Sequence, residues 1–381
     1  MDDRPIYLDY NATTPVLPEV VDAMLPYLRE HFGNPSSSHV YGRRTQAAID
    51  RARVQVAGLI GCDASEIIFT SGGTEANNLA IRGVAEARDA LRAVVTTVIE
   101  HPATAQPCAW LERHGWRVTR VGVDRDGRAR AEEARAAIDT TTALVTVMHS
   151  NNETGVLQPI TELAEIARDR GAVMHTDGAQ SVGKVPVNVR ELGVDLLSIA
   201  GHKLYAPKGV GALYVRCGTP LKPFVLGAGH EHGLRPGTEN VAYIVGLGLA
   251  CEYASQGLDQ RAARMQQLRD ELWERLAAQV PGLGLNGDPV RRLPNTLSVR
   301  FPRVSGNEVL AGAPAVAAST GSACHAGHES APGVILAMGA SEAEALGTVR
   351  LTLGRETTVE DVSRAVAALV GSWRRAQSRM L

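Results

Sequence analysis

The sequence lacks the features that mark disulfide-rich, zinc-binding, membrane-spanning or nucleic-acid-binding proteins. Its five cysteines are scattered and form no CxxC pair, which indicates neither a disulfide framework nor a structural zinc site. No run of about 18 uncharged apolar residues occurs, and this argues against a membrane-spanning helix. The net charge of -2 offers no basic excess for binding nucleic acid or an acidic membrane surface.

Aromatic residues are also scarce, at 4% of the chain, whereas glycine is abundant, with 38 residues. Residues 1–5 contain neither a basic region nor an apolar stretch, so we expect no secretory signal and predict a cytoplasmic location. Hydrophobic residues make up 44% and charged residues 21% of the 381 residues, which is typical of a globular enzyme with a large core.

Between residues 65 and 215, short β-branched runs alternate with helix-like segments such as residues 161–170. This alternation is typical of βαβ units and predicts an α/β fold with a mostly parallel sheet. In such sheets, ligands bind beyond the carboxyl ends of the strands. The predicted strands are residues 67–70, 94–99, 144–148, 173–175, 196–199 and 211–215.

A second region begins near residue 250. Residues 258–280 carry apolar side chains at helical spacing and are followed by a Pro-Gly pair that ends the predicted helix. Two further strands, at 297–301 and 348–353, precede a closing helix at 359–373. We therefore predict a large domain over residues 16–250 and a smaller α/β domain formed by residues 1–15 and 251–381.

Polar residues that follow four of the predicted strands point to a site for pyridoxal phosphate (PLP). Lys203 offers an amine for a Schiff base, and Asp177 a carboxylate that would keep a pyridine nitrogen protonated. His101 would stack on the ring, and Asn152 lies after a further strand. Three of them have plainer alternatives, since a lone lysine is usually solvated, a lone aspartate usually caps a helix, and His101 also fits a hydrogen-bonded histidine of the core. Their combination favours the cofactor site.

Residues 71–77 follow the strand at 67–70 and precede a helical run. Glycines let the backbone approach an anion, and the free amides of a helix N-terminus bind phosphate. The segment matches neither the phosphate-loop pattern nor GxGxxG, so nucleotide binding is unsupported. A tight turn capped by Thr74 remains the alternative explanation.

Eight segments occur in an order that resembles the PLP-dependent cysteine desulfurase and selenocysteine lyase family, of class V and fold type I. The resemblance extends from about residue 6 to residue 365. It implies a large domain with a mostly parallel seven-stranded sheet and a smaller α/β domain. The segments are residues 7–15, 33–37, 70–77, 151–155, 177–180, 201–203, 235–240 and 321–324.

The resemblance implies a role for each matching residue. Lys203 would hold PLP as a Schiff base, Asp177 would pair with the pyridine nitrogen, and His101 would stack on the ring. Arg350 would clamp the substrate carboxylate, because a guanidinium group binds a carboxylate through two donors. Further contacts are implied for Asn152 and Gln180 at the phenolate side, Gly73, Thr74 and His202 at the phosphate, Thr238 at a partner subunit's cofactor in a homodimer, and Asn11 at the substrate.

Cys324 lies in residues 318–327, a run of small and polar residues typical of a mobile catalytic loop. A desulfurase or lyase needs a thiol that reaches the sulfur or selenium of its substrate and then moves away. The other four cysteines, Cys62, Cys108, Cys217 and Cys251, fit the usual role of a small buried hydrophobe better.

Two departures from the family pattern favour the selenocysteine lyase branch. Ala200 stands where many desulfurases carry a hydroxyl residue on the phosphate, and His325 follows the cysteine, where we expect it to contact the substrate. The histidines at 230, 232, 325 and 328 match no known ligand spacing, so we expect no metal site.

These observations predict a homodimeric PLP enzyme that converts L-selenocysteine or L-cysteine to L-alanine, with selenocysteine preferred and a chalcogen-acceptor protein as a further partner. The main alternative is a cysteine desulfurase that forms a persulfide on Cys324. A PLP aminotransferase would need no Cys324, and a non-catalytic scaffold of this fold would form no Schiff base at Lys203.

Overall fold

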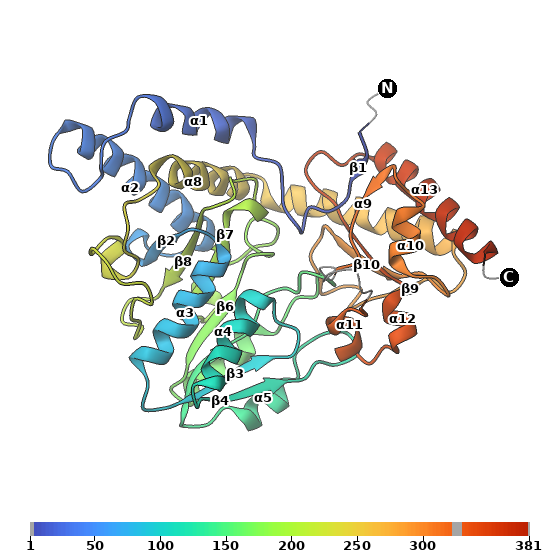
Figure 1. Ribbon diagram of the computed structural model, residues 1–381, viewed down its shortest axis with the longest axis horizontal. Helices are drawn as coiled ribbons and strands as arrows, with labels where there is room; N and C mark the ends of the chain where they lie inside the picture. Colours follow the sequence, from blue (N-terminus) through green and yellow to red (C-terminus); the bar gives the residue numbers. More distant parts are fainter. Residues whose placement is uncertain (1–3, 322–329, 380–381) are drawn as a thin grey trace.

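The computed structural model describes residues 4–321 and 330–379, which form two α/β parts (Figure 1). The larger part is built on a seven-stranded sheet with the order β2-β8-β7-β6-β5-β3-β4. Strand β8 runs antiparallel to both of its neighbours, and the other adjacent pairs are parallel. The predicted α/β fold with a mostly parallel sheet is confirmed. Its strands are β2 (Ile67–Thr70), β3 (Ala93–Thr97), β4 (Arg117–Val121), β5 (Thr142–Thr146), β6 (Val173–Asp177), β7 (Leu196–Ala200) and β8 (Gly211–Val215).

Helices cover both faces of this sheet, which explains why its central strands are apolar on both sides. Ile67 and Phe69 of β2 pack into one core cluster, whereas Ile68 between them packs into another on the opposite face. Helices α2, α6 and α8 contribute to the first cluster, and α3 and α4 to the second. The helices of this part are α1 (Pro18–Arg29), α2 (Val40–Ile60), α3 (Gly73–Ala87), α4 (Pro102–Arg113), α5 (Ala131–Ala137), α6 (Ile160–Asp169), α7 (Val189–Leu192) and α8 (Val241–Ser255).

The smaller part contains a three-stranded antiparallel sheet with the order β12-β10-β9 and a core of its own. Helices α9 (Leu258–Gln279) and α13 (Val359–Ser378) pack on each other and supply much of that core. The remaining elements are β9 (Gly284–Leu285), β10 (Thr296–Arg300), α10 (Gly306–Ala311), α11 (Gly333–Ala337), α12 (Glu342–Leu346) and β12 (Thr348–Thr352).

The N-terminal segment crosses between the two parts. Strand β1 (Ile6–Tyr7) pairs with β11 (Val316–Ala317), and Ile6 and Leu8 are buried in the core of the smaller part. The chain then reaches the large sheet, where the main-chain N–H of Thr14 donates to the carbonyl oxygen of His202 at 3.0 Å. The domain limits at residues 16 and 250 stay a prediction. Within the described ranges, no helix combines the length and apolar character needed to cross a membrane.

Candidate active site

The carboxyl ends of four adjacent parallel strands, β7, β6, β5 and β3, form one edge of the large sheet. Asp177 is the last residue of β6, and Lys203 ends the short 3-10 helix η2 (Gly201–Lys203) that follows β7. His101 and Asn152 lie in the segments that follow β3 and β5. The parallel arrangement therefore collects at one edge the four residues that pointed to a PLP site.

Lys203 is partly buried, and its amine donates hydrogen bonds to the main-chain oxygens of Asn11 at 2.6 Å and Ala12 at 2.7 Å. Burial and the positive charge of Arg350 lower the pKa of Lys203 to about 8, although two nearby aspartates oppose the shift. A larger fraction of this amine is therefore neutral near pH 7 than for a solvated lysine, and the neutral amine is the nucleophile that attacks a carbonyl.

The carboxylate of Asp177 is buried and oriented by two donors. The Asn77 side chain donates to Oδ2 at 2.7 Å, and the Ala179 main-chain N–H donates to Oδ1 at 2.9 Å. The sequence prediction gave Asn77 no role, because 100 residues separate it from Asp177 and only the packing of α3 against the sheet joins them. These contacts hold a negative charge in a fixed position within the site.

His101 caps the N-terminus of α4, where its Nδ1 accepts a hydrogen bond from the Ala103 main-chain N–H at 3.1 Å. This contact places the proton of the neutral ring on Nε2. Partial desolvation and the charge of Lys203 lower the pKa of His101, although Asp177 opposes them. Much of the side chain remains exposed, which leaves a neutral ring available for stacking.

A glycine-containing turn precedes α3 beside the end of β7. The first main-chain N–H groups of a helix have no partner within it, and the helix dipole favours an anion there. A Cβ at Gly73 would lie 3.1 Å from the Cβ of Ala200, and Gly72 has a φ of 147°. Thr74 is exposed at the second position of the helix. Ala200 thus places only a methyl group against this turn, where a serine would add a hydroxyl.

His202 is tied to the N-terminal segment. Its Nδ1 lies 3.1 Å from the Thr13 hydroxyl oxygen, and burial together with nearby lysines lowers the pKa of His202 to about 4. The ring is therefore neutral near pH 7, and its predicted contact with a phosphate stays a prediction.

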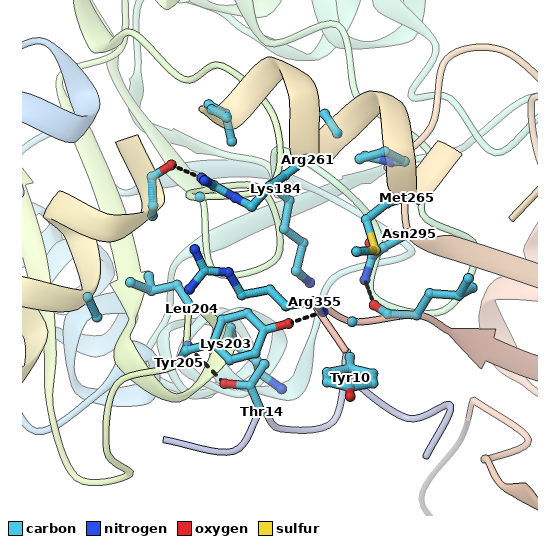
Figure 2. Close-up of a pocket in the computed structure, with 18 of the residues that line it drawn as sticks. Tyr10, Thr14, Lys184, Lys203, Leu204, Tyr205, Arg261, Met265, Asn295 and Arg355 are labelled. Atoms are coloured by element: carbon cyan, nitrogen blue, oxygen red, sulfur yellow. Dashed lines mark hydrogen bonds between the residues drawn. The ribbon is translucent and has the colours of Figure 1, made fainter. Parts of the chain in front are cut away.

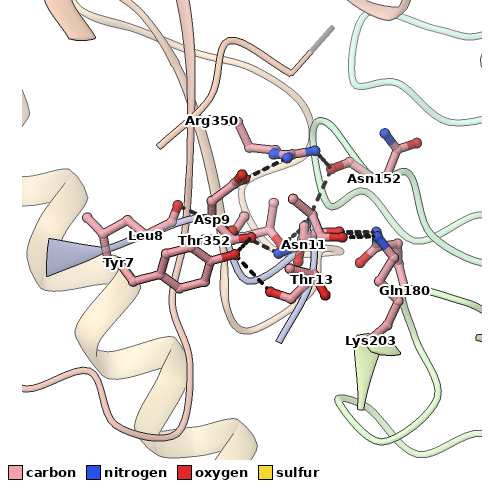
Figure 3. Close-up of polar contacts among 12 residues, drawn as sticks. Tyr7, Leu8, Asp9, Asn11, Thr13, Asn152, Gln180, Lys203, Arg350 and Thr352 are labelled. Atoms are coloured by element: carbon pink, nitrogen blue, oxygen red, sulfur yellow. Dashed lines mark hydrogen bonds and ion pairs between the residues drawn. The ribbon is translucent and has the colours of Figure 1, made fainter. Parts of the chain in front are cut away.

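Arg350 on β12 is 5% exposed and reaches the site from the smaller part (Figure 3). Its Nη2 donates to the Asp9 carboxylate at 2.8 Å, and its Nη1 donates to the main-chain oxygen of Asn152 at 2.9 Å. Its buried Nε has no hydrogen-bond partner among the residues the structure describes. The guanidinium group is therefore held by two acceptors, and among the described residues its Nε is left as an unpaired donor.

Asn11 occupies the centre of the polar network, and its side chain is fully engaged. Its Oδ1 accepts hydrogen bonds from Lys184 at 2.9 Å and Asn295 at 3.2 Å. Its Nδ2 donates to Thr296 at 2.9 Å and to the main-chain oxygen of Asn152 at 3.3 Å. A direct contact with the substrate would require one of these bonds to break, so the predicted substrate contact stays a prediction and a supporting role is evident.

Gln180 lies beside Asn11, and the side chains of both residues accept a hydrogen bond from Lys184. Gln180 Nε2 donates to the main-chain oxygen of Asn11 at 2.9 Å, and its Oε1 accepts from Lys184 at 2.8 Å. The sequence prediction missed Lys184, which lies four residues after Gln180, the last residue of the recognised motif at 177–180. Its spacing to a site residue was the available signal.

Thr238 lies far along the chain from these residues and is exposed, after the turn η3 (Glu231–Gly233). That turn is anchored by the buried Glu231, which forms an ion pair of 2.7 Å with Arg53 and accepts the Phe69 main-chain N–H at 2.8 Å. The anchor fixes the start of the segment that carries Thr238. In residues 4–321 and 330–379, no group of three His, Cys, Asp or Glu side chains is placed to hold a metal ion.

The chain that leads to residue 322 passes beside Arg350, whose main-chain N–H donates to the carbonyl oxygen of Ser319 at 2.7 Å. A Cβ at Gly321 would lie 3.3 Å from the carboxyl oxygen Oε2 of Glu153. Burial raises the pKa of Glu153 to about 7, although Arg350 opposes the shift. Cys324 and His325 lie outside the described residues, so their roles stay predictions.

Comparison with known proteins decides the family. Residues 6–365 match the model of the family described as aminotransferase class-V. The chain belongs to this family. It is also 45% identical over 369 residues to a protein named cysteine desulfurase IscS from Dictyoglomus turgidum. The aligned region covers 96% of this chain and 94% of that relative.

Two solved structures resemble this class-V protein closely. One is named NifS-like protein and has a TM-score of 0.90 at 36% identity, covering 96% of this chain and 98% of that one. Another is named SspA in complex with cysteine, with a TM-score of 0.81 at 36% identity, covering 91% of this chain and 98% of that one. The Dictyoglomus relative is named for cysteine desulfurase, and the SspA structure is named as a complex with cysteine. The comparisons therefore favour the sulfur alternative, and the predicted selenium preference receives no support from them.

Class-V aminotransferases and cysteine desulfurases depend on PLP, and the residues present fit this cofactor. Lys203 supplies an amine of lowered pKa, Asp177 a fixed carboxylate for the ring nitrogen, and His101 an exposed neutral ring. The glycine-containing turn before α3 leaves open the space that a phosphate needs. The predicted cofactor is confirmed.

Proposed function

We propose that this class-V protein is a cysteine desulfurase, which converts L-cysteine to L-alanine and transfers the sulfur to an acceptor protein. One observation carries the proposal: the Lys203 amine and the Arg350 guanidinium group lie in the same polar network. Asn11 and the main-chain oxygen of Asn152 connect them. An α-amino acid carries its amine and carboxylate on one carbon. A carbonyl cofactor at Lys203 beside a carboxylate-binding cation fits this substrate class.

The choice of cysteine rests on the relatives. Proteins covering nearly the whole chain at 45% identity are named cysteine desulfurase, and a structure of 36% identity is named as a complex with cysteine. The predicted thiol at position 324 supplies a group that a transaminase does not need. These observations support sulfur chemistry over amino-group transfer.

When bound, PLP accepts the electron pair that remains at the substrate Cα after that carbon loses its proton. The amine of Lys203 takes this proton and later returns one to the same carbon, which suits its pKa of about 8. Asp177 would keep the pyridine nitrogen protonated, and Arg350, whose Nε has no hydrogen-bond partner among the described residues, would hold the substrate carboxylate. The exposed, neutral ring of His101 would stack on the cofactor ring.

Cys324 completes the reaction in this proposal. Its thiolate attacks the sulfur of the substrate, an S–S bond forms, and the bond between Cβ and sulfur breaks. The carbon fragment takes up a proton at Cβ and leaves as alanine, and Cys324 keeps the sulfur as a persulfide. An acceptor protein then removes that sulfur by attacking the outer sulfur atom.

The proposal includes a homodimer in the cytoplasm. Large apolar side chains are exposed in the described structure, including Phe32 at 78% and Leu226 at 86%. Apolar side chains of this exposure are consistent with burial between two subunits. Leu226 lies in the segment that leads to Thr238, which the proposal places at the partner's cofactor.

The proposal is tested by measuring alanine and sulfide released from L-cysteine in the presence of a thiol reductant. We expect wild-type protein to form both, and Lys203→Ala to lose at least about 100-fold in rate because the proton-transferring amine is gone. Cys324→Ala should lose alanine formation to a similar extent. Cys217, predicted to be buried, is exposed in the structure. Cys217→Ala is therefore the matched control, with an unchanged rate.

Parallel assays with L-selenocysteine and with an amino-acid and keto-acid pair separate the alternatives. Full alanine formation by Cys324→Ala, or amino-group exchange without sulfide, would show that the protein is not a desulfurase. Turnover confined to selenocysteine would restore the selenium alternative.

A further inference from the structure

Lys184 stands out against the composition of the chain. Of its 39 basic residues, four are lysines, at positions 184, 203, 208 and 222. Lysine is therefore the rarer of the two cationic residues in this chain. Two of the four lysines, Lys184 and Lys203, nevertheless lie in the polar network of the candidate site, where a compact amine differs from a guanidinium group in the hydrogen bonds it can make.

The surroundings of Lys184 are those of a site residue. It lines the same cavity as Lys203, a space of about 60 Å³ between the two parts of the molecule (Figure 2). Among residues 4–321 and 330–379, it forms no ion pair with a carboxylate. Burial and the positive charges of Lys203 and Arg350 lower its pKa well below the usual value. An amine in such surroundings costs stability, so a purely structural role would not favour it.

We propose that Lys184 is a positioning residue of the cofactor site, which acts through the side chains of Gln180 and Asn11. Its Nζ donates to Gln180 Oε1 at 2.8 Å and to Asn11 Oδ1 at 2.9 Å. Because an amine nitrogen with its protons faces both atoms, each must be the oxygen end of its amide. Both the ammonium form and the neutral amine have enough hydrogens for the two bonds.

Fixing these amides fixes the Lys203 amine. With its oxygen on Lys184, Gln180 turns its Nε2 to the main-chain oxygen of Asn11, at 2.9 Å. That same oxygen accepts from Lys203 Nζ at 2.6 Å. A flipped Gln180 would place its own oxygen against this carbonyl, and the repulsion would displace the acceptor on which Lys203 depends.

The inference deepens the proposed function, and its consequence for catalysis rests on that proposal. Its test uses the bound cofactor alone, so it can fail or succeed independently of the substrate. The variants are Lys184→Met, which keeps the chain length and removes both donations, and Lys222→Met, which removes an exposed lysine. We measure the visible absorption spectrum of the PLP-loaded protein and the rate at which it loses PLP on dilution.

We expect Lys184→Met to lose PLP about tenfold faster and to shift the absorption maximum, whereas Lys222→Met behaves as wild type. A structural role alone would be independent of Gln180. We therefore add Gln180→Leu and the double variant: if Lys184 acts through Gln180, the double variant should lose PLP no faster than the worse single variant. The proposal would be overturned if the two single substitutions multiplied each other's effect on the rate of PLP loss in the double variant. It would also be overturned if Lys184→Met lost PLP at a rate within twofold of wild type.

If Lys184→Met does not fold, Lys184→Arg decides the question, because arginine can still donate to both oxygens. PLP loss within about threefold of wild type in folded Lys184→Arg supports the proposal. A faster loss in folded Lys184→Arg, with an unshifted spectrum, contradicts it.

Discussion

Glu100, directly before His101, is a carboxyl group in surroundings that favour its neutral form. It accepts hydrogen bonds from the Thr97 hydroxyl at 2.6 Å and from the Met148 main-chain N–H at 3.1 Å. Burial is the largest cause that raises the pKa of Glu100 to about 8, and the charge of Asp177 adds to it. A carboxyl group of this kind holds its proton at neutral pH and links the ends of β3 and β5.

The raised pKa of Glu100 makes stability depend on pH. In the unfolded chain a glutamate has a pKa of about 4.3, so the folded state binds more protons between that value and about 8. The contribution of Glu100 is complete below about pH 4.3 and is lost as pH rises through about 8. We expect Glu100→Gln to show a smaller fall in Tm between pH 6 and pH 9 than wild type.

The measurement is thermal unfolding of both proteins at the two pH values, with Glu86→Gln, an exposed glutamate, as the control. An equal fall in Tm for Glu100→Gln and wild type would show that Glu100 is already ionised at pH 6.

At the scale of elements, α2 and α8 pack closely on each other. A Cβ at Gly248 of α8 would lie 2.7 Å from the Cβ of Ala52 in α2, closer than side chains tolerate. On the other side of α2, Gly58 is exposed and has nothing within 4 Å of an added Cβ. In this helix pair, Gly248 is therefore needed for the close contact between α2 and α8, whereas Gly58 is not needed for any contact.

We expect Gly248→Ala to destabilise the protein by about 1–3 kcal/mol, because the helices must separate. Gly58→Ala should stabilise it by about 0.5–1 kcal/mol, because alanine loses less conformational freedom in a helix. Urea unfolding of both variants measures the difference. Equal effects of the two substitutions would contradict the close approach of α2 and α8.

The sequence predicted the buried elements well. The strands at 67–70 and 211–215 agree with β2 and β8 residue for residue, and the helix at 258–280 agrees with α9 to within one residue. The edge strand β4 was missed, because its alternation of Arg, Val and Thr lacks the apolar run of a central strand. That β8 runs antiparallel inside the sheet was not predicted, since periodicity carries no strand direction.

For the site, too, local patterns in the sequence predicted some residues and missed those that depend on tertiary packing. Residues at the ends of strands, such as Asp177 and Lys203, were predicted because parallel strands share one edge. Their supports were not, because the contacts of Asn77 with Asp177 and of Lys184 with Asn11 depend on tertiary packing. The contact of Lys184 with Gln180 is local, and its four-residue spacing was the one signal in the sequence. The pairing of Arg350 with Asp9 spans 341 residues, and no local pattern signals it.

At the scale of the whole molecule, the proposed homodimer makes a prediction about which subunit supplies Thr238. If Thr238 acts at the partner's cofactor, a mixed dimer of Lys203→Ala and Thr238→Val contains one site with both residues intact. If Thr238 acts within its own chain, each site in the mixed dimer carries one defect.

Refolding the two variants together should therefore restore alanine formation above the level of either variant alone. The mixed dimer is isolated with two different affinity tags, and each variant refolded by itself is the control. Activity no greater than the average of the two controls would place Thr238 at the cofactor of its own chain.

The N-terminal segment also determines when the site can form during synthesis. Residues 6–14 contact strand β12 and the turn after β7. The ion pair of Asp9 with Arg350 can therefore form only after Arg350 has been synthesised. Ribosomes add about 5–20 residues per second, and Arg350 is therefore made roughly 20 to 70 s after Asp9. The core of the large sheet can form in that interval, with Lys203 already present. A chain still on the ribosome thus holds the amine that the proposal assigns to PLP before it holds the cation that the proposal assigns to the substrate carboxylate.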